Sequence, residues 1–195
     1  MRNTVLYLSG PAGAGKSAVA QLLETKYGFH RIGLSGFCHA MADETGVPPT
    51  RRTLQKLGDA LRTRMDDPAA LAVLAWRRAM STPGPVVIEG VRLHAEAAYL
   101  RTQDAIGVAV EAPELVRAAR LRVRDGSDRV PAHATEREAG SGPVDLRIAN
   151  GGDRPALEQA VRLAVAWAAL LQAERVSRIK TAWTTGTTAT ARLER

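Results

Sequence analysis

The chain has few of the features that mark secreted or membrane-spanning proteins. It contains a single cysteine, Cys38, which excludes an internal disulfide framework. No run of about 18 uncharged apolar residues occurs, so no segment is predicted to span a membrane. The first residues hold Arg2 and then a strand-like run, without an apolar leader and its cleavage site. We therefore expect a protein of the reducing cytoplasm that has no membrane partner.

Aromatic residues are also scarce, at 4% of the 195 residues. They leave few surfaces on which the bases of a single-stranded nucleic acid can stack. Lys and Arg outnumber Asp and Glu by 27 to 20, which gives a formal net charge of +7. This excess favours phosphate-bearing partners, although codon bias also explains an Arg-rich composition. The apolar content of 45% is enough for one sizeable core and predicts a single domain.

Short apolar runs alternate with amphipathic segments along the chain. Strands are predicted at residues 4–8, 31–34, 86–88, 106–110 and 145–148. Helices are predicted at residues 16–26, 37–45, 53–65, 68–80, 94–101, 113–123 and 155–178. This alternation predicts an α/β fold with a five-stranded, parallel, doubly wound sheet, whose ligands bind beyond the carboxyl ends of the strands.

The predicted domain covers residues 1–180 and includes two less regular parts. Helices within about residues 36–81 are expected to form the acceptor region. Residues 124–143 are rich in charge and glycine and lack periodicity, which predicts a mobile lid. Residues 181–195 are rich in Thr and Ala with few apolar anchors, which predicts a flexible tail. The oligomeric state is left open between monomer and homodimer.

The most specific motif is GPAGAGKS at residues 10–17, which joins the first predicted strand to the first predicted helix. This is the P-loop pattern in its usual context, and it predicts a P-loop NTPase fold. Glycines let backbone N–H groups surround phosphates, and the helix amino terminus adds partial positive charge. The predicted ATP-binding residues are Gly10, Ala12, Gly13, Ala14, Gly15, Lys16 and Ser17. Lys16 is expected to reach the β- and γ-phosphates as a catalytic residue, and the Ser17 hydroxyl to hold Mg²⁺.

A second motif, VVIEG at residues 86–90, is similar to a Walker B strand that ends in a carboxylate. Glu89 stands where Asp is more common. It is predicted to bind Mg²⁺ through water or to accept a proton, and a solvent-facing acid is the competing interpretation. ATP and Mg²⁺ are thus the predicted cofactors.

Arginines crowd the segment that leads into the predicted lid. They are Arg117, Arg120, Arg122, Arg124 and Arg129. A closing lid can deliver such groups to the charge of a transferring phosphoryl group. Arg120 and Arg124 share one helix face and are predicted to be catalytic, whereas a solvated face is favoured for Arg117 and Arg122. Arg129 is predicted to contact the substrate.

The predicted helix at residues 53–65 and the residues just before it carry two neighbouring stripes. Leu54, Leu57, Leu61 and Met65 form the expected core stripe, and Arg51, Gln55, Gly58 and Arg62 lie beside it. A glycine inside a helix costs roughly 1 kcal/mol relative to alanine, which is understandable if a ligand approaches closely. Guanidinium groups match phosphate geometry. We therefore predict that this second stripe binds the acceptor, with an Arg-rich surface helix as the competing interpretation.

These residues carry a family resemblance. The pattern Arg52-x-x-Leu-Gln-x-Leu-Gly-x-x-x-Arg62, followed by Gly90-Val-Arg92 after the second motif and Glu96 nearby, resembles the deoxynucleoside monophosphate kinases of phages and their bacterial relatives. The wider likeness is to the nucleoside monophosphate kinase superfamily, including dephospho-coenzyme A kinases, and it covers about residues 4–173.

The resemblance implies roles for residues at matching positions. It implies that Gln55, Arg62 and Arg92 contact the acceptor and that Arg120 and Arg124 act from the lid. It also implies that Asn150 and Gly151, after the last predicted strand, lie beside the adenine of ATP.

The chain departs from this superfamily after the second predicted strand. Common relatives carry an acid and an arginine there, whereas this chain reads LSGFCHA at residues 34–40. Dephospho-coenzyme A kinases use an Asp there as general base, so its absence weighs against that activity. Phe37 is predicted to stack on a base, with an apolar core position as an equal alternative.

The acceptor chemistry follows from the charges. A monophosphate is already an anion and needs positive charge but no base, whereas a hydroxyl acceptor needs one. The many arginines favour a (deoxy)nucleoside monophosphate that is converted to the diphosphate.

Two alternatives to this acceptor stay open. One is transfer to a hydroxyl of a nucleoside, a small metabolite or a hydroxymethylpyrimidine in DNA, with Glu89 as base and DNA the less favoured partner. The other is a non-catalytic nucleotide-binding regulator.

Overall fold

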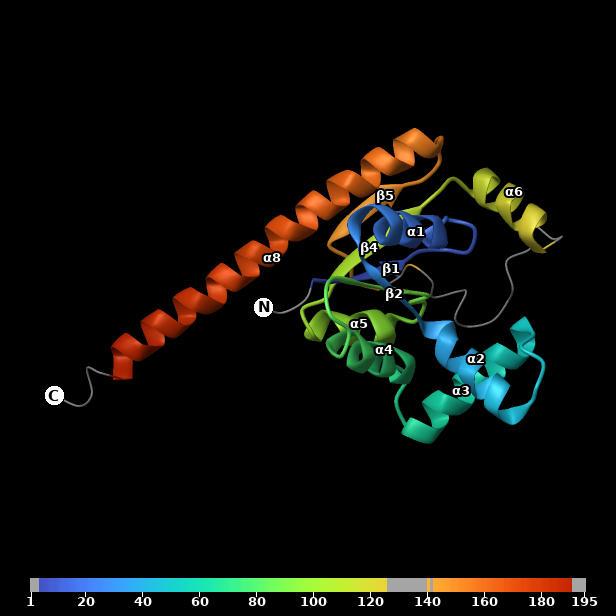
Figure 1. Ribbon diagram of the computed structural model, residues 1–195, viewed down its shortest axis with the longest axis horizontal. Helices are drawn as coiled ribbons and strands as arrows, with labels where there is room; N and C mark the ends of the chain where they lie inside the picture. Colours follow the sequence, from blue (N-terminus) through green and yellow to red (C-terminus); the bar gives the residue numbers. More distant parts are fainter. Residues whose placement is uncertain (1–3, 126–139, 141, 191–195) are drawn as a thin grey trace.

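The protein is built on one five-stranded sheet, seen in a computed structural model that describes residues 4–125, 140 and 142–190 (Figure 1). The strands are β1 (Val5–Ser9), β2 (His30–Gly33), β3 (Val86–Glu89), β4 (Ile106–Glu111) and β5 (Leu146–Ala149). They lie in the order β2-β3-β1-β4-β5, and each pair is parallel. This confirms the predicted α/β fold of the P-loop NTPase type with a five-stranded parallel sheet.

The helices begin and end close to the predicted positions, with a few exceptions. They are α1 (Lys16–Tyr27), α2 (Leu34–Thr45), α3 (Arg51–Met65), α4 (Ala70–Met80), α5 (His94–Thr102), α6 (Glu114–Asp125) and α8 (Arg154–Thr190). α3 starts earlier than predicted because the Thr50 hydroxyl accepts a hydrogen bond from the Thr53 N–H at 3.2 Å. α2 starts at Leu34, directly after β2.

Helices cover both faces of the sheet, because alternate side chains of each strand point to opposite sides. Leu6 and Leu8 of β1 pack into one core with α1 and α8. Val5 and Tyr7 of the same strand pack into a second core with α2, α4 and α5. Figure 1 shows α1 and α8 on one side of the strands and α4 and α5 on the other. The layers therefore follow from the alternating apolar pattern of the central strand.

Two predictions about the ends of helices are corrected. α8 continues to Thr190, past the predicted end near residue 178, so residues 181–190 of the predicted tail have a helical backbone. A helix that is already nucleated extends cooperatively, and no proline follows Pro155 to stop it. Met65, expected in the core stripe, is 37% exposed because it is the last residue of α3. Despite the length of α8, no helix among the described residues is apolar enough to cross a membrane.

The site is positioned by the sheet register. Tyr7 of β1 is paired with Ile88 of β3, and Gly33 of β2 with Glu89. Because these strands are parallel, their carboxyl ends meet at one edge, where the P-loop, the start of α2 and Glu89 all lie. The predicted lid at residues 124–143 falls mostly outside the described residues, as does Arg129, and residues 191–195 are likewise not described.

Candidate active site

The P-loop has a backbone shape that only glycine adopts readily at three positions. Gly10, Gly13 and Gly15 have φ values of 134°, 77° and 95°. A Cβ atom on Gly13 would lie 2.7 Å from the Arg117 carbonyl oxygen, and one on Gly15 would overlap the Asn150 amide. α1 begins at Lys16, so the amino-terminal end of this helix, with its partial positive charge, lies at the same loop. The loop therefore fits an anion such as a phosphate chain.

Lys16 is held inside this loop. Its Nζ donates to the carbonyl oxygens of Gly10 at 2.6 Å and Pro11 at 2.9 Å. Burial, followed by the nearby charges of Arg92 and Arg124, lowers the pKa of Lys16 to about 8, while Glu89 acts in the opposite direction. Loss of hydration and repulsion between like charges both disfavour the ammonium form. A phosphate in the loop would favour that form again, so the site is electrostatically prepared for an anion.

Glu89 has a partner that the sequence did not indicate. Its Oε1 accepts from Arg31 Nη2 at 2.7 Å, and its side chain is 18% exposed. Arg31 also pairs with Glu24 at 3.3 Å. Both contacts stabilise the charged guanidinium, and the pKa of Arg31 is raised, chiefly by its hydrogen bond to Glu89. Glu89 therefore lies at the end of β3 as one half of an ion pair.

The residues predicted to hold Mg²⁺ fit this ion's usual demands. Mg²⁺ typically takes one or two protein oxygens, several waters and the phosphates of its substrate. Ser17 and Glu89 line the same cavity beside Lys16. Within the described chain, no three His, Cys, Asp or Glu side chains gather into a metal cluster. Any Mg²⁺ bound with ATP would thus depend on Ser17, Glu89 and the phosphates.

Side chains from α6 and from the residue that follows β5 contact the backbone of the P-loop. Asn150, which is 4% exposed, donates from Nδ2 to the Ala14 carbonyl oxygen at 2.8 Å. Arg120 Nη1 lies 3.4 Å from the Gly13 carbonyl oxygen, and Arg117 Nη1 lies 3.4 Å from that of Ala12. The expectation of a solvated Arg117 is therefore wrong, because its guanidinium contacts the loop. The Asn150 amide is committed to the loop, and the neighbouring Gly151 is exposed.

Two cavities lie at this edge of the sheet and share part of their walls. We name the larger one, of about 370 Å³, the donor cavity; it is lined by Ala12, Gly13, Gly15, Lys16, Ser17, Ser35, Arg51, Glu89, Gly90, Arg92, Arg120, Leu121 and Arg124. We name the smaller one, of about 160 Å³, the acceptor cavity; it is lined by Leu34, Ser35, Cys38, Arg51, Leu54, Gln55, Gly58, Arg62, Leu71, Gly90, Arg92 and Glu96. The residues common to both are Ser35, Arg51, Gly90 and Arg92. A group bound in one cavity would therefore lie next to a group bound in the other.

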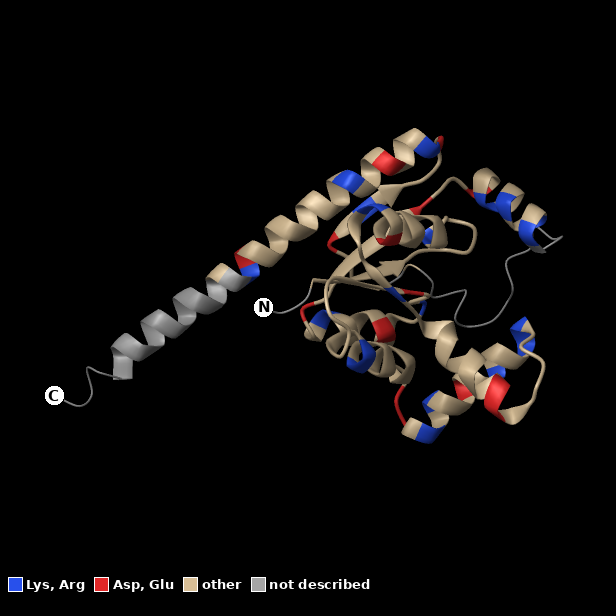
Figure 2. Ribbon diagram, in the orientation of Figure 1, with Lys and Arg blue, Asp and Glu red and all other residues tan. Residues whose placement is uncertain are grey.

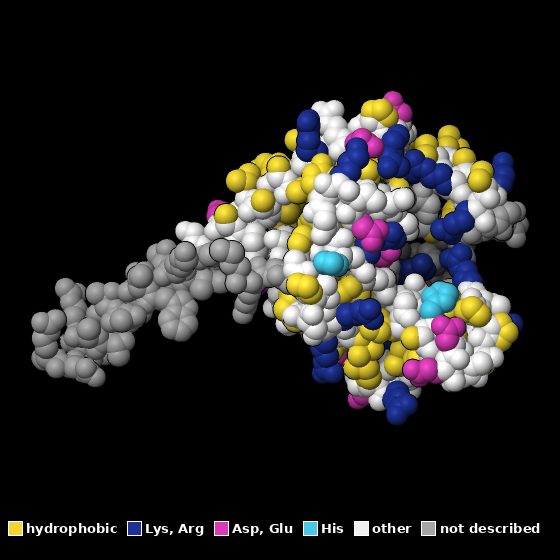
Figure 3. Space-filling view, viewed as in Figure 1, with side chains coloured by type: hydrophobic (Ala, Val, Ile, Leu, Met, Phe, Trp, Pro, Cys, Tyr) yellow, Lys and Arg dark blue, Asp and Glu magenta, His cyan; other side chains and the backbone are white. Residues whose placement is uncertain are grey.

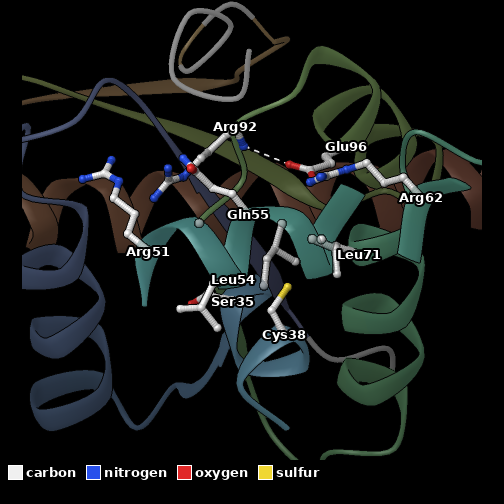
Figure 4. Close-up of a pocket in the computed structure, with 12 residues that line it drawn as sticks. Ser35, Cys38, Arg51, Leu54, Gln55, Arg62, Leu71, Arg92 and Glu96 are labelled. Atoms are coloured by element: carbon white, nitrogen blue, oxygen red, sulfur yellow. Dashed lines mark hydrogen bonds and ion pairs between the residues drawn. The ribbon is translucent and has the colours of Figure 1, made fainter. Parts of the chain in front are cut away.

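The acceptor cavity is framed by an ion pair between two elements. Arg62 of α3 donates from Nη2 to Glu96 Oε1 at 2.8 Å, and from Nη1 to Asp59 at 3.1 Å. Glu96 is 1% exposed, and its Oε2 accepts from the backbone N–H groups of Arg92 at 3.0 Å and Leu93 at 3.1 Å. Figure 4 shows Arg62 and Glu96 closing one end of the cavity, with Arg51 and Arg92 at the other end (Figure 4).

Positive charge collects where the two cavities meet. Burial, and after it the neighbouring Arg51, lower the pKa of Arg92, which indicates crowded cations. In Figure 2 the Lys and Arg residues of α6 and α3 flank the same region, and Figure 3 shows basic side chains around a hollow there (Figures 2 and 3). Guanidinium groups that are crowded in this way favour an anion between them.

The structure brings most of the predicted site residues together. All four residues of the second stripe, Arg51, Gln55, Gly58 and Arg62, line the acceptor cavity, as Arg92 does. Phe37 does not line it: the ring packs against the core that contains Ile32 and Leu34, which supports the alternative of a core position.

Sequence reasoning missed Arg31 and did not assign roles to Ser35 or Glu96. Glu96 alone carried a signal, since an acid in the first turn of a predicted helix is a capping residue.

The comparisons with known proteins agree with this geometry. A family described as "AAA domain" matches residues 6–139, well over half of the chain, and this stretch holds both the P-loop and the acceptor helices. The chain belongs to the AAA domain family. No curated protein matches this AAA domain in sequence.

Solved structures share the fold of this AAA domain at low sequence identity. TT1252 from Thermus thermophilus has a TM-score of 0.59 at 18% identity, over 85% of this chain and 98% of its own. A gluconokinase from Sinorhizobium meliloti 1021 has a TM-score of 0.52 at 17% identity, over 91% and 97%. The Mycobacterium tuberculosis APS kinase CysC, in complex with AMPPNP and APS, has a TM-score of 0.53 at 19% identity, over 84% and 96%.

Proposed function

We propose that this AAA domain is an ATP-dependent kinase whose acceptor is a nucleotide, a (deoxy)nucleoside monophosphate that it converts to the diphosphate. The observation that carries this proposal is the common wall of the two cavities. Arg51 and Arg92 line both the donor cavity around Lys16 and the acceptor cavity around Arg62. Two anions that must react with one another need this kind of shared positive wall.

Each group of the site has a role in the proposed transfer. An oxygen of the acceptor phosphate attacks the γ-phosphorus of ATP, the bond to the β–γ bridging oxygen breaks, and ADP leaves with that electron pair. Lys16 and the P-loop hold the donor phosphates, and Arg51 and Arg92 hold the acceptor phosphate. Arg120 and Arg124 bring positive charge from α6 to the transferring group. Mg²⁺, when bound, neutralises charge on the donor phosphates.

The fold neighbours support phosphoryl transfer as the reaction class. Two of them are named as kinases, the gluconokinase and the APS kinase, and the APS kinase structure contains the ATP analogue AMPPNP. Their identities to this chain are 17% and 19%, so the proposed acceptor depends on the cavity residues of this chain.

A phosphate acceptor is favoured over a hydroxyl because of how the carboxylates are used. A hydroxyl acceptor needs a base within hydrogen-bond reach. The two carboxylates that line the cavities are both engaged, Glu89 by Arg31 and Glu96 by Arg62. A second candidate keeps Glu89 as base for a hydroxyl, including that of a hydroxymethylpyrimidine in DNA, because Glu89 lines the donor cavity beside Lys16. A regulator that binds ATP without transfer is the third candidate.

Acceptor-dependent ADP formation tests these candidates. The purified chain is incubated with ATP, Mg²⁺ and, in separate reactions, deoxynucleoside monophosphates, nucleosides, sugars and hydroxymethylated DNA, and products are identified by mass spectrometry. We expect diphosphates from the monophosphate reactions, and a loss of more than about a hundredfold in the Lys16→Ala variant. Turnover that is confined to hydroxyl compounds would replace the proposal by the second candidate. ATP binding without any product would favour the third.

A further inference from the structure

Two buried side-chain nitrogens of the acceptor cavity have no hydrogen-bond partner within the described part of the chain. They are Gln55 Nε2 and Arg62 Nε. The two residues lie on one face of α3, two turns apart, and both line the cavity. Buried polar groups in native proteins are nearly always satisfied, so a pair of orphaned donors in one cavity indicates that a bound ligand completes them.

Arg62 has one N–H donor left for a ligand, that of Nε, because its other two nitrogens already donate to carboxylates of the protein. Nη2 donates to Glu96 and Nη1 to Asp59, which sets the plane of the guanidinium. The remaining Nε–H can only donate, since a guanidinium has no acceptor. Gln55 presents its amide in the same cavity, with Nε2 as its buried end. In Figure 4 the two side chains extend from the same helix into the cavity, with the Gln55 amide beside Arg92 and the Arg62 guanidinium beside Glu96.

The part of the acceptor cavity around Gln55 and Arg62 offers few hydrogen-bond acceptors for these two donors. Glu96 uses Oε1 for Arg62 and Oε2 for the backbone N–H groups of Arg92 and Leu93. The rest of the interior wall is largely apolar, with Leu34, Leu54, Leu71 and Cys38. A flat ring with a carbonyl oxygen at its edge would suit these two donors, whereas an exocyclic amino group in the position of that oxygen would present a donor to them.

We propose that the acceptor cavity selects a base with an oxo group at C4 of a pyrimidine or C6 of a purine, where cytosine and adenine carry an amino group, and that Arg62 Nε and Gln55 Nε2 donate hydrogen bonds to the carbonyl edge of that base. This inference rests on the proposed function, because it names the base of the proposed nucleotide acceptor. The phosphate of that acceptor lies toward Arg51 and Arg92, at the wall common to both cavities, and the base lies toward Gln55 and Arg62. Uracil, thymine, hypoxanthine and guanine meet the requirement, and cytosine and adenine do not. Glu96 is a positioning residue, because it orients Arg62 without facing the base through a free oxygen.

Two matched pairs of substrates compare an oxo edge with an amino edge. Deoxyuridine and deoxycytidine monophosphates differ by an oxo or an amino group at C4 and by the proton on the adjacent N3, and deoxyinosine and deoxyadenosine monophosphates differ in the same way at C6 and N1. We expect kcat/KM for the oxo member to exceed that for the amino member by at least about tenfold in a pair whose ring size the cavity accepts, because an unmatched buried donor is strongly disfavoured. Equal values in both pairs, or an advantage for the amino members, would overturn the inference and leave the proposed function intact.

Variants then assign the effect to the two side chains. Arg62→Lys keeps a cation near Glu96 but removes the Nε–H, so the oxo preference should fall toward one. Gln55→Glu replaces the donor by an acceptor and should shift the preference toward the amino member. Arg64→Lys, on an exposed position of the same helix, should leave the ratio unchanged. An oxo preference that persists in both cavity variants would count against these residues as its origin.

Binding separates a failure of this inference from a failure of the proposed function. The four monophosphates are titrated into the wild-type chain in the presence of AMPPNP, and affinities are measured by calorimetry. If none is phosphorylated but the oxo members bind at least about tenfold more tightly, the inference stands while the kinase proposal fails. If none of the four binds, the inference fails as well. These measurements use the wild-type chain, so they do not depend on a variant that folds poorly.

Discussion

Arg62 and Glu96 form an ion pair of 2.8 Å that joins α3 to the first turn of α5, and Glu96 is almost wholly buried. The same carboxylate holds the backbone N–H of Arg92, whose side chain lines both cavities. One acid thus fixes the two cationic ends of the acceptor cavity relative to one another. Because catalysis by positioning depends on such fixed distances, this pair links the packing of α3 to the proposed chemistry.

Removing the charge of Glu96 should destabilise the fold. The Glu96→Gln change leaves the Arg62 guanidinium, with 15% side-chain exposure, without the buried one of its two ionic partners. Breaking one side of a buried pair typically lowers the free energy of unfolding by about 3–5 kcal/mol. We expect a loss at the lower end of this range, because Arg62 keeps its contact with Asp59. Urea denaturation of both proteins measures the difference.

An exposed ion pair gives the matched control for that change. Lys26 and Glu158 have side-chain exposures of 48% and 33%, so Glu158→Gln should lower the free energy of unfolding much less than Glu96→Gln does. Similar losses in the two variants would mean that the Arg62–Glu96 pair has no special weight in the fold.

The state of Lys16 should make ATP binding depend on pH. In the free protein its pKa is about 8, lowered mainly by burial. The phosphates of ATP bind the charged form better, so the gain in affinity is full below this pKa and is lost as the pH rises through it. We expect the affinity for AMPPNP, measured by calorimetry from pH 7 to pH 9.5, to fall by up to about tenfold per pH unit above pH 8.

Arginine at position 16 tests whether Lys16 is the source of this dependence. A guanidinium stays charged over the whole range, so the Lys16→Arg variant should show a nearly flat profile above pH 8 even if its affinity is lower. A decline that is as steep in this variant would assign the titration to another group.

The sheet and most of the candidate site could be predicted from the sequence, because short stretches of neighbouring residues encode them. The P-loop combines a strand, a glycine turn and a helix start within a few residues, and each of these has its own signal. The second stripe of α3 follows from helical periodicity, and the structure places Arg51, Gln55, Gly58 and Arg62 on one cavity as that periodicity requires.

The missed features depend on pairs that are far apart in the chain. Arg31 meets Glu89 only because β2 lies beside β3, and no local pattern encodes that neighbour. Phe37 was ambiguous because one aromatic residue near a site suits a core as well as a base. Arg117 was misassigned because helical spacing cannot indicate that α6 lies against the P-loop, where its guanidinium contacts the Ala12 carbonyl oxygen. Long-range packing decides such cases.

The support that Asn150 gives to the P-loop should be measurable. Its buried amide donates to the Ala14 carbonyl oxygen, and Asn150→Ala would leave that contact unmade. We expect a loss of about 1–3 kcal/mol in the free energy of unfolding, and weaker binding of AMPPNP because the loop loses its brace. Calorimetry and urea denaturation check both effects. Unchanged affinity for AMPPNP together with lower stability would restrict Asn150 to a structural role.

The Gly58→Ala change should affect the free energy of unfolding and the KM for the acceptor in different ways. A Cβ atom there would meet Arg62 Nη1 at 3.4 Å, Cys38 Sγ at 3.5 Å and Leu71 Cδ1 at 3.7 Å, so alanine fits the folded chain. Because alanine is the better helix former, Gly58→Ala should raise the free energy of unfolding by up to about 1 kcal/mol. The added methyl group also projects into the acceptor cavity, so KM for the acceptor should rise severalfold while the affinity for AMPPNP stays the same.

Gly36 in α2 provides the control, because a Cβ atom there meets nothing within 4 Å and the residue is not part of either cavity wall. Gly36→Ala should share the gain in stability without the change in KM. If Gly58→Ala left the KM for every acceptor unchanged, the glycine would not be a point of close approach. The ligand would then have to lie nearer the wall that the two cavities share, because a bound group that reaches past Gln55 toward Arg62 must pass this helix turn.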